Sequence, residues 1–304
     1  MTRRRRPTGP SMFLTASISV QSMLAGQHAW VRTAKFGSTY RDEVETAVGL
    51  ALQCGEAMRS AAQSQRSKTL KDGQEGIDPV TATDLENEAI VSRGLRERFP
   101  THAIIGEETA SSAGCIPAVD LATPTWVVDP IDGTQNFCKG LPLSAVSIGL
   151  CVGGLPTVGC VYDPYRDELF LGVAGVAAYC NGEPIHADAT CTTLSDALVC
   201  TDLGYERSQA GVARIASVHA ALLDANTFGL RNYGSTVLSA VWVASGRANA
   251  FYSGLASRDC PKPWDWCAAA AIGAASGVCF RRFDGTDGEE AFEFTAPSGL
   301  CCAG

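Results

Sequence analysis

The 304-residue sequence lacks an apolar segment long enough to cross a membrane, because its most apolar stretch, residues 267–277, is about half of the required 20 or so residues. It also lacks a Cys-x-x-C pair. The 13 cysteines are odd in number and are spread from Cys54 to Cys302, so neither a disulfide framework nor a zinc site can be read from them. We therefore predict reduced thiols in an intracellular, cytoplasmic protein without a membrane partner.

Acidic residues are absent from residues 1–41, which contain seven Arg and Lys residues. This basic extension is interpreted either as a mitochondrial-type targeting signal or as a disordered tail. The rest of the chain holds the other 17 of the 24 basic residues and all 32 acidic residues, a net charge of −15. Such an acidic protein is a poor partner for nucleic acid, and one that handles phosphate requires metal ions to reverse the local field. With 46% apolar and 18% charged residues, the composition is that of a globular protein.

Residues 126–134 (Trp-Val-Val-Asp-Pro-Ile-Asp-Gly-Thr) form the most informative stretch. Residues 125–128 are β-branched or aromatic and uncharged, which predicts a buried strand, and the chain is then predicted to leave the strand as a loop at Asp129 and Pro130. Asp129 and Asp132 lie three residues apart across a proline-fixed bend. Their like charges repel at pH 7 unless a hard divalent cation, such as Mg²⁺, lies between them.

The two residues that follow are suited to phosphate. Gly133 permits close backbone approach, and the Thr134 hydroxyl group can face a phosphate group or a metal-bound water. The alternative is an ordinary Asp-Pro turn that binds nothing.

Two amphipathic helices are predicted before this stretch. Residues 42–65 place apolar side chains at steps of three and four, which indicates a core helix. In the second helix, Thr83 and Glu86 have the spacing of a capping box. Asp84, in its first turn, has two interpretations: it interacts favourably with the helix dipole, or it points into a site.

A short strand predicted at residues 103–105 ends in Gly106, Glu107 and Glu108. Adjacent glutamates usually mark a solvated corner. These two follow a buried strand, however, as Asp129 does, and catalytic groups gather where strands end and loops begin. We therefore include Glu107 and Glu108 among the candidate site residues.

Beyond the central stretch, four β-rich runs within residues 144–180 predict an antiparallel meander, which an Asn181-Gly182 turn closes. Strands and helices then alternate. The folded chain is accordingly divided into an N-terminal α+β half, residues 42–190, with the metal site, and a tightly coupled C-terminal α/β half, residues 191–304.

The C-terminal half adds two further candidate positions. A helix predicted over residues 235–246 begins at Gly234 and Ser235, whose N–H groups can bind an anion. Asp265 stands at the N-terminus of an alanine-rich helix, where its ordinary role is that of a cap. The last hairpin is predicted from residues 277–283 and 291–295.

Three motifs together resemble the inositol monophosphatase family of metal-dependent, lithium-sensitive phosphatases. They are Gly106-Glu107-Glu108, the run Trp-Val-Val-Asp-Pro-Ile-Asp-Gly-Thr-Gln-Asn-Phe at residues 126–137, and Trp264-Asp265 before the alanine-rich helix. The resemblance covers about residues 42–300. It implies a layered α/β/α/β/α sandwich, a Mg²⁺ cofactor and a homodimer.

The resemblance also implies roles for individual residues. Its metal-binding positions correspond to Glu107, Asp129, the Ile131 carbonyl group, Asp132 and Asp265, with Glu108 next to the first of them. Thr134 and Asp84 correspond to the pair that positions and activates the attacking water, and Glu107 completes the catalytic set. The substrate-binding set is Gly133, Thr134, Gly234, Ser235, Ser253 and Asp265.

One departure concerns the alcohol part of the substrate. The family often has an acidic residue where this chain has Ser253, and about five extra residues lie between Ser253 and Trp264. We therefore expect a broad substrate range, because a short hydroxyl group cannot hold a polyol as a carboxylate can.

The predicted function is Mg²⁺-dependent hydrolysis of inositol monophosphate, a small-molecule phosphate monoester. Bisphosphate nucleotidase, fructose bisphosphatase and histidinol phosphatase are alternatives with the same chemistry. A non-catalytic relative that binds metal or ligand is an alternative of a different class, and the complete set of carboxylates argues against it.

Overall fold

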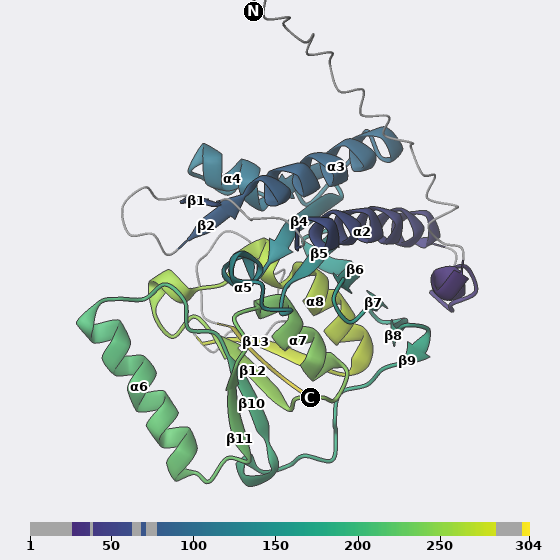
Figure 1. Cartoon of the computed structure of the whole chain (residues 1–304). Coiled ribbons are helices and arrows are strands. Elements are labelled where there is room, and N and C mark those ends of the chain that lie inside the picture. The colour runs from purple at the N-terminus through teal and green to yellow at the C-terminus, as the bar shows by residue number, and fades with distance from the viewer. Residues whose placement is uncertain (1–25, 37–38, 63–67, 71–77, 284–299) are drawn as a thin grey trace, which may run out of the picture.

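The structure is a computed structural model that describes residues 26–36, 39–62, 68–70, 78–283 and 300–304. Its elements stack in five layers: a helix pair, a seven-stranded sheet, a second helix pair, a five-stranded sheet and a single helix (Figure 1). The predicted layered α/β/α/β/α architecture is therefore confirmed.

Seven strands form the larger sheet, in the spatial order β3-β4-β5-β6-β7-β8-β9. Their bounds are β3 Ala103–Gly106, β4 Thr125–Asp132, β5 Ala145–Val152, β6 Leu155–Asp163, β7 Glu168–Val173, β8 Ala177–Cys180 and β9 Glu183–Pro184. Strands β3 and β4 are parallel, and the other neighbours are antiparallel. The predicted hairpin turn is confirmed, because Asn181 and Gly182 join β8 to β9 with φ values of 49° and 90°.

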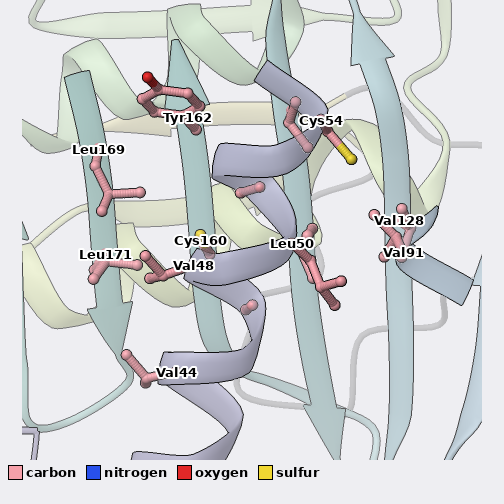
Figure 2. Packing of buried hydrophobic residues seen from close by; sticks show 14 of the residues in the cluster. Val44, Val48, Leu50, Cys54, Val91, Val128, Cys160, Tyr162, Leu169 and Leu171 are labelled. Atoms are coloured by element: carbon pink, nitrogen blue, oxygen red, sulfur yellow. The ribbon is translucent and has the colours of Figure 1, made fainter. Parts of the chain in front are cut away.

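Helices α2 (Arg41–Ala62) and α3 (Ala82–Arg98) cover one face of this sheet. Figure 2 shows α2 lying over the face of the sheet, with Val48 close to Cys160 of β6 and Leu171 of β7. All three side chains are fully buried, and burying a valine side chain of this kind stabilises the fold by about 1.5–3 kcal/mol. The helix predicted over residues 42–65 is confirmed as far as residue 62, and residues 63–65 lie outside the described part of the chain.

The second helix pair, α7 (Thr236–Ala244) and α8 (Pro263–Ser276), lies between the two sheets. Small residues on both sides bring α8 close to the larger sheet. A Cβ atom on Gly159 would lie 2.1 Å from the carbonyl oxygen of Ala268, and one on Gly172 would lie 2.5 Å from the Cα of Ile272. Glycines in the strands and alanines in the helix therefore determine this spacing.

The five-stranded sheet has the order β11-β10-β12-β14-β13. Its strands are β10 Leu198–Thr201, β11 Gly229–Asn232, β12 Ala250–Ser253, β13 Cys279–Arg282 and β14 Leu300–Ala303. Strand β10 is parallel to β11 and β12, and β14 is antiparallel to β12 and β13. The partner of β13 is thus β14, while the predicted strand at residues 291–295 lies outside the described residues. Helix α6 (Gln209–Asp224) covers the outer face through Val218 and Leu222.

Shorter elements complete the described chain. They are the 3₁₀ helices η1 Gly26–Arg32, η2 Leu194–Asp196 and η3 Ser257–Asp259, the hairpin strands β1 Lys68–Leu70 and β2 Pro79–Thr81, and the helices α4 Glu107–Ala113 and α5 Thr134–Lys139. None of the helices in these described ranges is long and apolar enough to span a membrane.

The N-terminal boundary predicted at Asp42 requires a correction. Val31 and Phe36 are buried in the same core cluster as α2, with exposed fractions of 0% and 2%. The ring of Phe36 packs edge-on against Tyr179 at 5.2 Å, and the Arg41 side chain donates to the Arg32 carbonyl group at 2.8 Å. The first acidic residue of the chain is Asp42, but burial of hydrophobic side chains begins earlier in the sequence. Residues 26–36 therefore belong to the fold. Residues 1–25 lie outside the description.

Candidate active site

The central stretch remains in strand conformation further than predicted. Strand β4 continues to Asp132, with every residue buried, whereas the sequence predicted a loop from Asp129. A shift in register against β5 between Asp129 and Asp132 marks a β-bulge. Such a bulge tolerates Pro130, which has no N–H group to pair, and bends the strand so that both carboxylates turn toward one point. The amide group of Asn87 donates to the Pro130 carbonyl group at 3.2 Å and holds the bend from α3.

Three carboxylates converge beside this bend. Asp129, Asp132 and Asp265 each place an oxygen atom within 4.8 Å of the others. Asp265 comes from the first turn of α8, the predicted alanine-rich helix, which begins at Pro263. The backbone N–H group of Lys262 donates to Asp265 Oδ2 at 2.5 Å, so the predicted capping role is also present.

Burial and like charge make this cluster electrostatically unfavourable without a cation. The pKa of Asp129 is well above its ordinary value, because the group is desolvated and because Glu107, Asp132 and Asp265 lie nearby. Desolvation also raises the pKa of Asp132, and Asp265 adds to the increase, although a hydrogen bond from Ser235 opposes it. A hard metal ion offsets both the desolvation of these carboxylates and their mutual repulsion, because carboxylate oxygens are the ligands that it prefers.

The donor set therefore fits a metal ion. Asp129, Asp132 and Asp265 supply oxygens, and Glu107 lies near Asp129. Glu107 and Ile131 line the same cavity, which has a volume of about 310 Å³. The carboxylate cluster is thus a candidate metal centre in the lining of a pocket.

Glu108 is not part of this centre, contrary to the prediction. It lines a separate hollow between α3 and α4, together with Arg96. Glu107 and Glu108 are consecutive at the start of helix α4, where successive side chains point about 100° apart, so only one of them can face the carboxylates. The backbone N–H group of Glu108 donates to Glu88 Oε2 at 2.7 Å.

Thr134 and Asp84 meet, as the resemblance implied. The Thr134 hydroxyl oxygen lies 3.2 Å from Asp84 Oδ1 and 2.9 Å from the Ile131 carbonyl oxygen, so it can donate to either. Thr134 begins helix α5 immediately after Gly133, whose φ of 84° places it in the left-handed region. A Cβ atom there would lie 2.8 Å from the Leu143 carbonyl oxygen, so glycine is required at this turn for two reasons.

The capping box of α3 differs from the predicted pair of Thr83 and Glu86. Thr81 is the N-cap, and its N–H group donates to Asp84 Oδ2 at 2.9 Å. The helix begins two residues earlier than expected, because Thr81, the last residue of β2, is its N-cap. Both interpretations of Asp84 hold, since one carboxylate oxygen caps the helix and the other faces Thr134.

The start of α7 does not offer free N–H groups to an anion, which corrects the interpretation of Gly234 and Ser235. The buried carboxylate of Asp202 accepts hydrogen bonds from both N–H groups and, at 2.7 Å, from the Thr236 hydroxyl group. The Ser235 hydroxyl group donates to Asp132 instead. These residues position the metal centre from the second sheet.

Ser253 lies at the end of β12 and lines the cavity, as predicted for a substrate-binding residue. Its side chain is 3% exposed, and its hydroxyl group donates to the Asp259 carbonyl group at 3.2 Å. Residues 258–262, in the segment that carries the extra residues, continue the cavity wall.

Sequence reasoning missed three polar residues near the site: the buried Asn87 and Glu88 and the half-buried Asp202. Asn87 and Glu88 share a helix face with Asp84, at steps of three and four residues, which is the spacing that could have identified them. Asp202 directly follows strand β10, and its position as a carboxylate at a strand end could have identified it.

Comparisons with known proteins agree with this geometry. The model of the family described as "Inositol monophosphatase family" matches residues 40–304. Inositol monophosphatase 1 of Solanum lycopersicum is 40% identical over 237 residues, which cover 77% of this chain and 82% of the relative. Inositol monophosphatase 2 of Homo sapiens is 39% identical over 230 residues, covering 75% and 76%.

Solved structures show the same fold. An inositol monophosphatase from Anabaena (Nostoc) is 27% identical, with a TM-score of 0.66 and coverage of 85% of this chain and 89% of that one. The extragenic suppressor protein suhB from Bartonella henselae is similar in fold at 24% identity, with a TM-score of 0.72 and coverage of 86% and 93%.

Proposed function

Because this chain belongs to the inositol monophosphatase family, we propose that it is a Mg²⁺-dependent phosphomonoesterase that hydrolyses inositol monophosphate to inositol and phosphate. The observation that carries the proposal is the convergence of Asp129, Asp132 and Asp265 beside the Thr134–Asp84 pair. Carboxylates alone would repel a phosphate group. A cation between them reverses the field, which suits an anionic substrate in an acidic protein.

Each residue has a role that its position supports. Asp129, Asp132 and Asp265 would hold Mg²⁺ with Glu107 and the Ile131 carbonyl group. When bound, the metal supplies charge neutralisation of the phosphate and lowers the pKa of water.

The remaining site residues orient the reactants. The Asp84 carboxylate is held by Thr81 and accepts from Thr134, so that the Thr134 hydroxyl oxygen can in turn accept a hydrogen bond from the attacking water and orient it. Gly133 and Ser253 both line the cavity, where Gly133 would lie beside the phosphate group and Ser253 beside the alcohol part of the substrate.

Alternatives within the same chemistry are a bisphosphate nucleotidase, a fructose bisphosphatase and a histidinol phosphatase. The names of the relatives favour inositol monophosphate as the first substrate to test. A non-catalytic relative is disfavoured, because the carboxylates and the Thr134–Asp84 pair are all present. We also propose that the protein is a homodimer in an intracellular compartment, on the basis of family resemblance and cysteine usage.

The test is phosphate release from a panel of inositol 1-phosphate, glycerol 2-phosphate, histidinol phosphate and a nucleoside 2′-phosphate, with Mg²⁺ and with EDTA. We expect Mg²⁺-dependent release from inositol 1-phosphate and slower release in millimolar Li⁺, a small hard cation that can enter an oxygen-lined site. Turnover of the other compounds without turnover of inositol 1-phosphate would contradict the proposed substrate.

A further inference from the structure

One wall of the cavity is built from two loops that leave the same edge of the five-stranded sheet. Strands β10 and β12 are parallel neighbours, with Thr201 paired to Tyr252, so the chain leaves both strands side by side. Residues 202–205 follow β10, residues 258–262 lie in the segment after β12, and both ranges line the cavity. The second loop is also the part of this chain that carries the extra residues.

Asp259 joins the two loops. It is 9% exposed, and its Oδ1 atom accepts hydrogen bonds from the backbone N–H groups of Tyr205 at 2.8 Å and Glu206 at 3.0 Å. Its carbonyl group accepts from the Ser253 hydroxyl group at 3.2 Å. One residue of the second loop therefore holds the first loop through its carboxylate and the end of β12 through its backbone.

Two further interactions support the same pair of loops. Local hydrogen bonds lower the pKa of Glu206, and the charge of Arg258 lowers it further, so opposite charges of the two loops attract each other. The Arg214 side chain of α6 donates to the Leu255 carbonyl group at 3.2 Å. Both interactions use exposed cationic side chains, which contribute little in water, so the hydrogen bonds of Asp259 are the main connection.

The metal centre is built on other parts of the fold. Asp129 and Asp132 belong to β4 in the larger sheet, and Asp265 belongs to α8, which packs between the two sheets. The two loops line the cavity together with Ser253, on the side where the alcohol part of the substrate would lie. A displacement of this wall should therefore affect the alcohol more than the phosphate group.

We infer that Asp259 is a positioning residue for the alcohol part of the substrate. It fixes the backbone of the first loop against the second and so determines how far apart they stand in the cavity wall. The hydrogen bonds of Oδ1, and not the charge of the carboxylate, perform this role, because both donors are backbone N–H groups of the other loop. The inference rests on the proposed phosphatase function and adds to it a residue that determines substrate affinity.

The experiment measures kcat and KM for inositol 1-phosphate and the inhibition constant of inorganic phosphate, all at saturating Mg²⁺. The wild type is compared with Asp259→Ala, Asp259→Asn and Asp259→Glu. Asparagine keeps an acceptor oxygen at the same distance from the backbone, whereas glutamate keeps the charge and moves the acceptor by one methylene group. The melting temperature of each protein is recorded as well.

The matched control is Asp163→Ala. Asp163 is also buried, and its Oδ1 atom accepts from the backbone N–H groups of Tyr165 at 2.9 Å and Arg166 at 3.2 Å, but it does not line the cavity. Its replacement should lower the melting temperature and leave KM within about twofold of the wild type, because the lost hydrogen bonds hold a different turn.

We expect Asp259→Ala and Asp259→Glu to raise KM about tenfold, the scale of a small loss of fit in a substrate pocket, and Asp259→Asn to stay within about twofold of the wild type. The values of kcat and of the phosphate inhibition constant should change by less than about twofold in all three variants. This pattern is that of lost substrate binding without loss of transition-state stabilisation.

An unchanged KM in Asp259→Ala and Asp259→Glu would overturn the inference. A KM that rises in Asp259→Asn but not in Asp259→Glu would also overturn it, because the charge would then be responsible, and this pair decides the question even when Asp259→Ala does not fold. A lower kcat together with weaker inhibition by phosphate would show that Asp259 supports the whole site and not the alcohol alone. These three outcomes leave the phosphatase function intact, whereas absence of phosphate release by the wild type would contradict that function and this inference with it.

Discussion

Asp202 is a buried carboxylate that connects the second sheet to the metal centre. It holds the start of α7 through the N–H groups of Gly234 and Ser235, and Ser235 in turn donates to Asp132. Burial raises the pKa of Asp202 to about 6, an increase that its three hydrogen bonds only partly oppose and to which the charge of Asp259 adds. The fold therefore contains a carboxylate whose charged form is unfavourable at neutral pH.

This property predicts how stability depends on pH in the absence of metal. Between the ordinary pKa near 3.8 and the folded value of about 6, the folded protein binds more protons at Asp202 than the unfolded chain does. The stabilising contribution is thus present at pH 4 and is lost as the pH rises to about 6. In the wild type, the free energy of unfolding should therefore fall between pH 4 and about pH 6. In Asp202→Asn this fall should be smaller, by up to roughly 3 kcal/mol.

The measurement is urea denaturation of both proteins in EDTA from pH 4 to pH 7. Asp120→Asn is the control, because backbone and side-chain hydrogen bonds lower the pKa of this exposed acid and its removal should not reduce the fall. Parallel stability curves for the wild type and Asp202→Asn would contradict the prediction.

Sequence reasoning identified the residues that bring charge to the site more readily than those that hold the site in shape. Asp129, Asp132 and Thr134 could be predicted because like charges at close spacing imply a cation. Asn87 could not, because its partner is the Pro130 carbonyl group, and which backbone group a side chain reaches depends on the tertiary fold. Glu108 was assigned wrongly, because the sequence alone does not show which of two adjacent helical side chains faces a cavity.

At the scale of elements, one face of α3 holds three separate parts of the site. Asp84 contacts Thr134, Asn87 contacts the bend in β4, and Glu88 accepts hydrogen bonds from the N–H groups of Glu108 and Thr109 at 2.7 and 2.9 Å. Glu88 thereby fixes the start of α4, the turn that carries Glu107. A carboxylate at a helix N-terminus is also favoured by the helix dipole.

We predict that Glu88→Ala weakens metal binding more than it slows turnover. Without the acceptor, the buried N–H group of Glu108 and the partly buried N–H group of Thr109 lose their partner, at a cost of about 1–3 kcal/mol, and the turn that holds Glu107 loosens. The Mg²⁺ concentration for half-maximal activity should rise several-fold, while kcat at saturating Mg²⁺ changes less.

The matched control is Glu86→Ala, which removes an exposed carboxylate from the same helix. Glu88→Gln, which keeps one acceptor oxygen, should lie between the two. A variant Glu88→Ala that melts at a lower temperature but needs no additional Mg²⁺ would show that Glu88 serves stability alone.

The type of an element could be predicted where the spacing of apolar residues or the residues of a turn were distinctive. Examples are the helix that begins near Asp42 and the turn at Asn181 and Gly182. Strand β4 was cut short in the prediction, because Pro130 ordinarily ends a strand. The bulge that accommodates this proline arises from pairing with β5, and such long-range pairing leaves no local signal.

At the scale of the whole molecule, the core extends across the boundary that charge suggested. Residues 26–36 pack on the face formed by α2 and the larger sheet, although this segment shares its lack of acids with the residues before it. The amino-acid composition shows only the charge of this segment. The burial of Val31 and Phe36 could not be predicted from it, because it depends on a surface that exists only after the sheet has formed.

We predict that Phe36→Ala destabilises the protein by about 3 kcal/mol, because it leaves a cavity next to Tyr179 in the core. Phe228→Ala is the matched control, since this ring is 73% exposed and its removal should cost less than about 0.5 kcal/mol. Thermal or urea unfolding measures both. Equal stability of the two variants would mean that residues 26–36 do not contribute to the folded core.

The most direct test of the account is the dependence of phosphate release on Mg²⁺ and on the three converging carboxylates. The rate of inositol 1-phosphate hydrolysis is measured across a Mg²⁺ titration for the wild type, Asp129→Asn and Asp265→Asn. Glu183→Gln, an exposed acid on β9, is the control. We predict no activity in EDTA, recovery with Mg²⁺ in the wild type and control, and a kcat at least about a hundredfold lower in both Asp variants. Full activity in EDTA, or undiminished kcat in both variants, would contradict the metal centre.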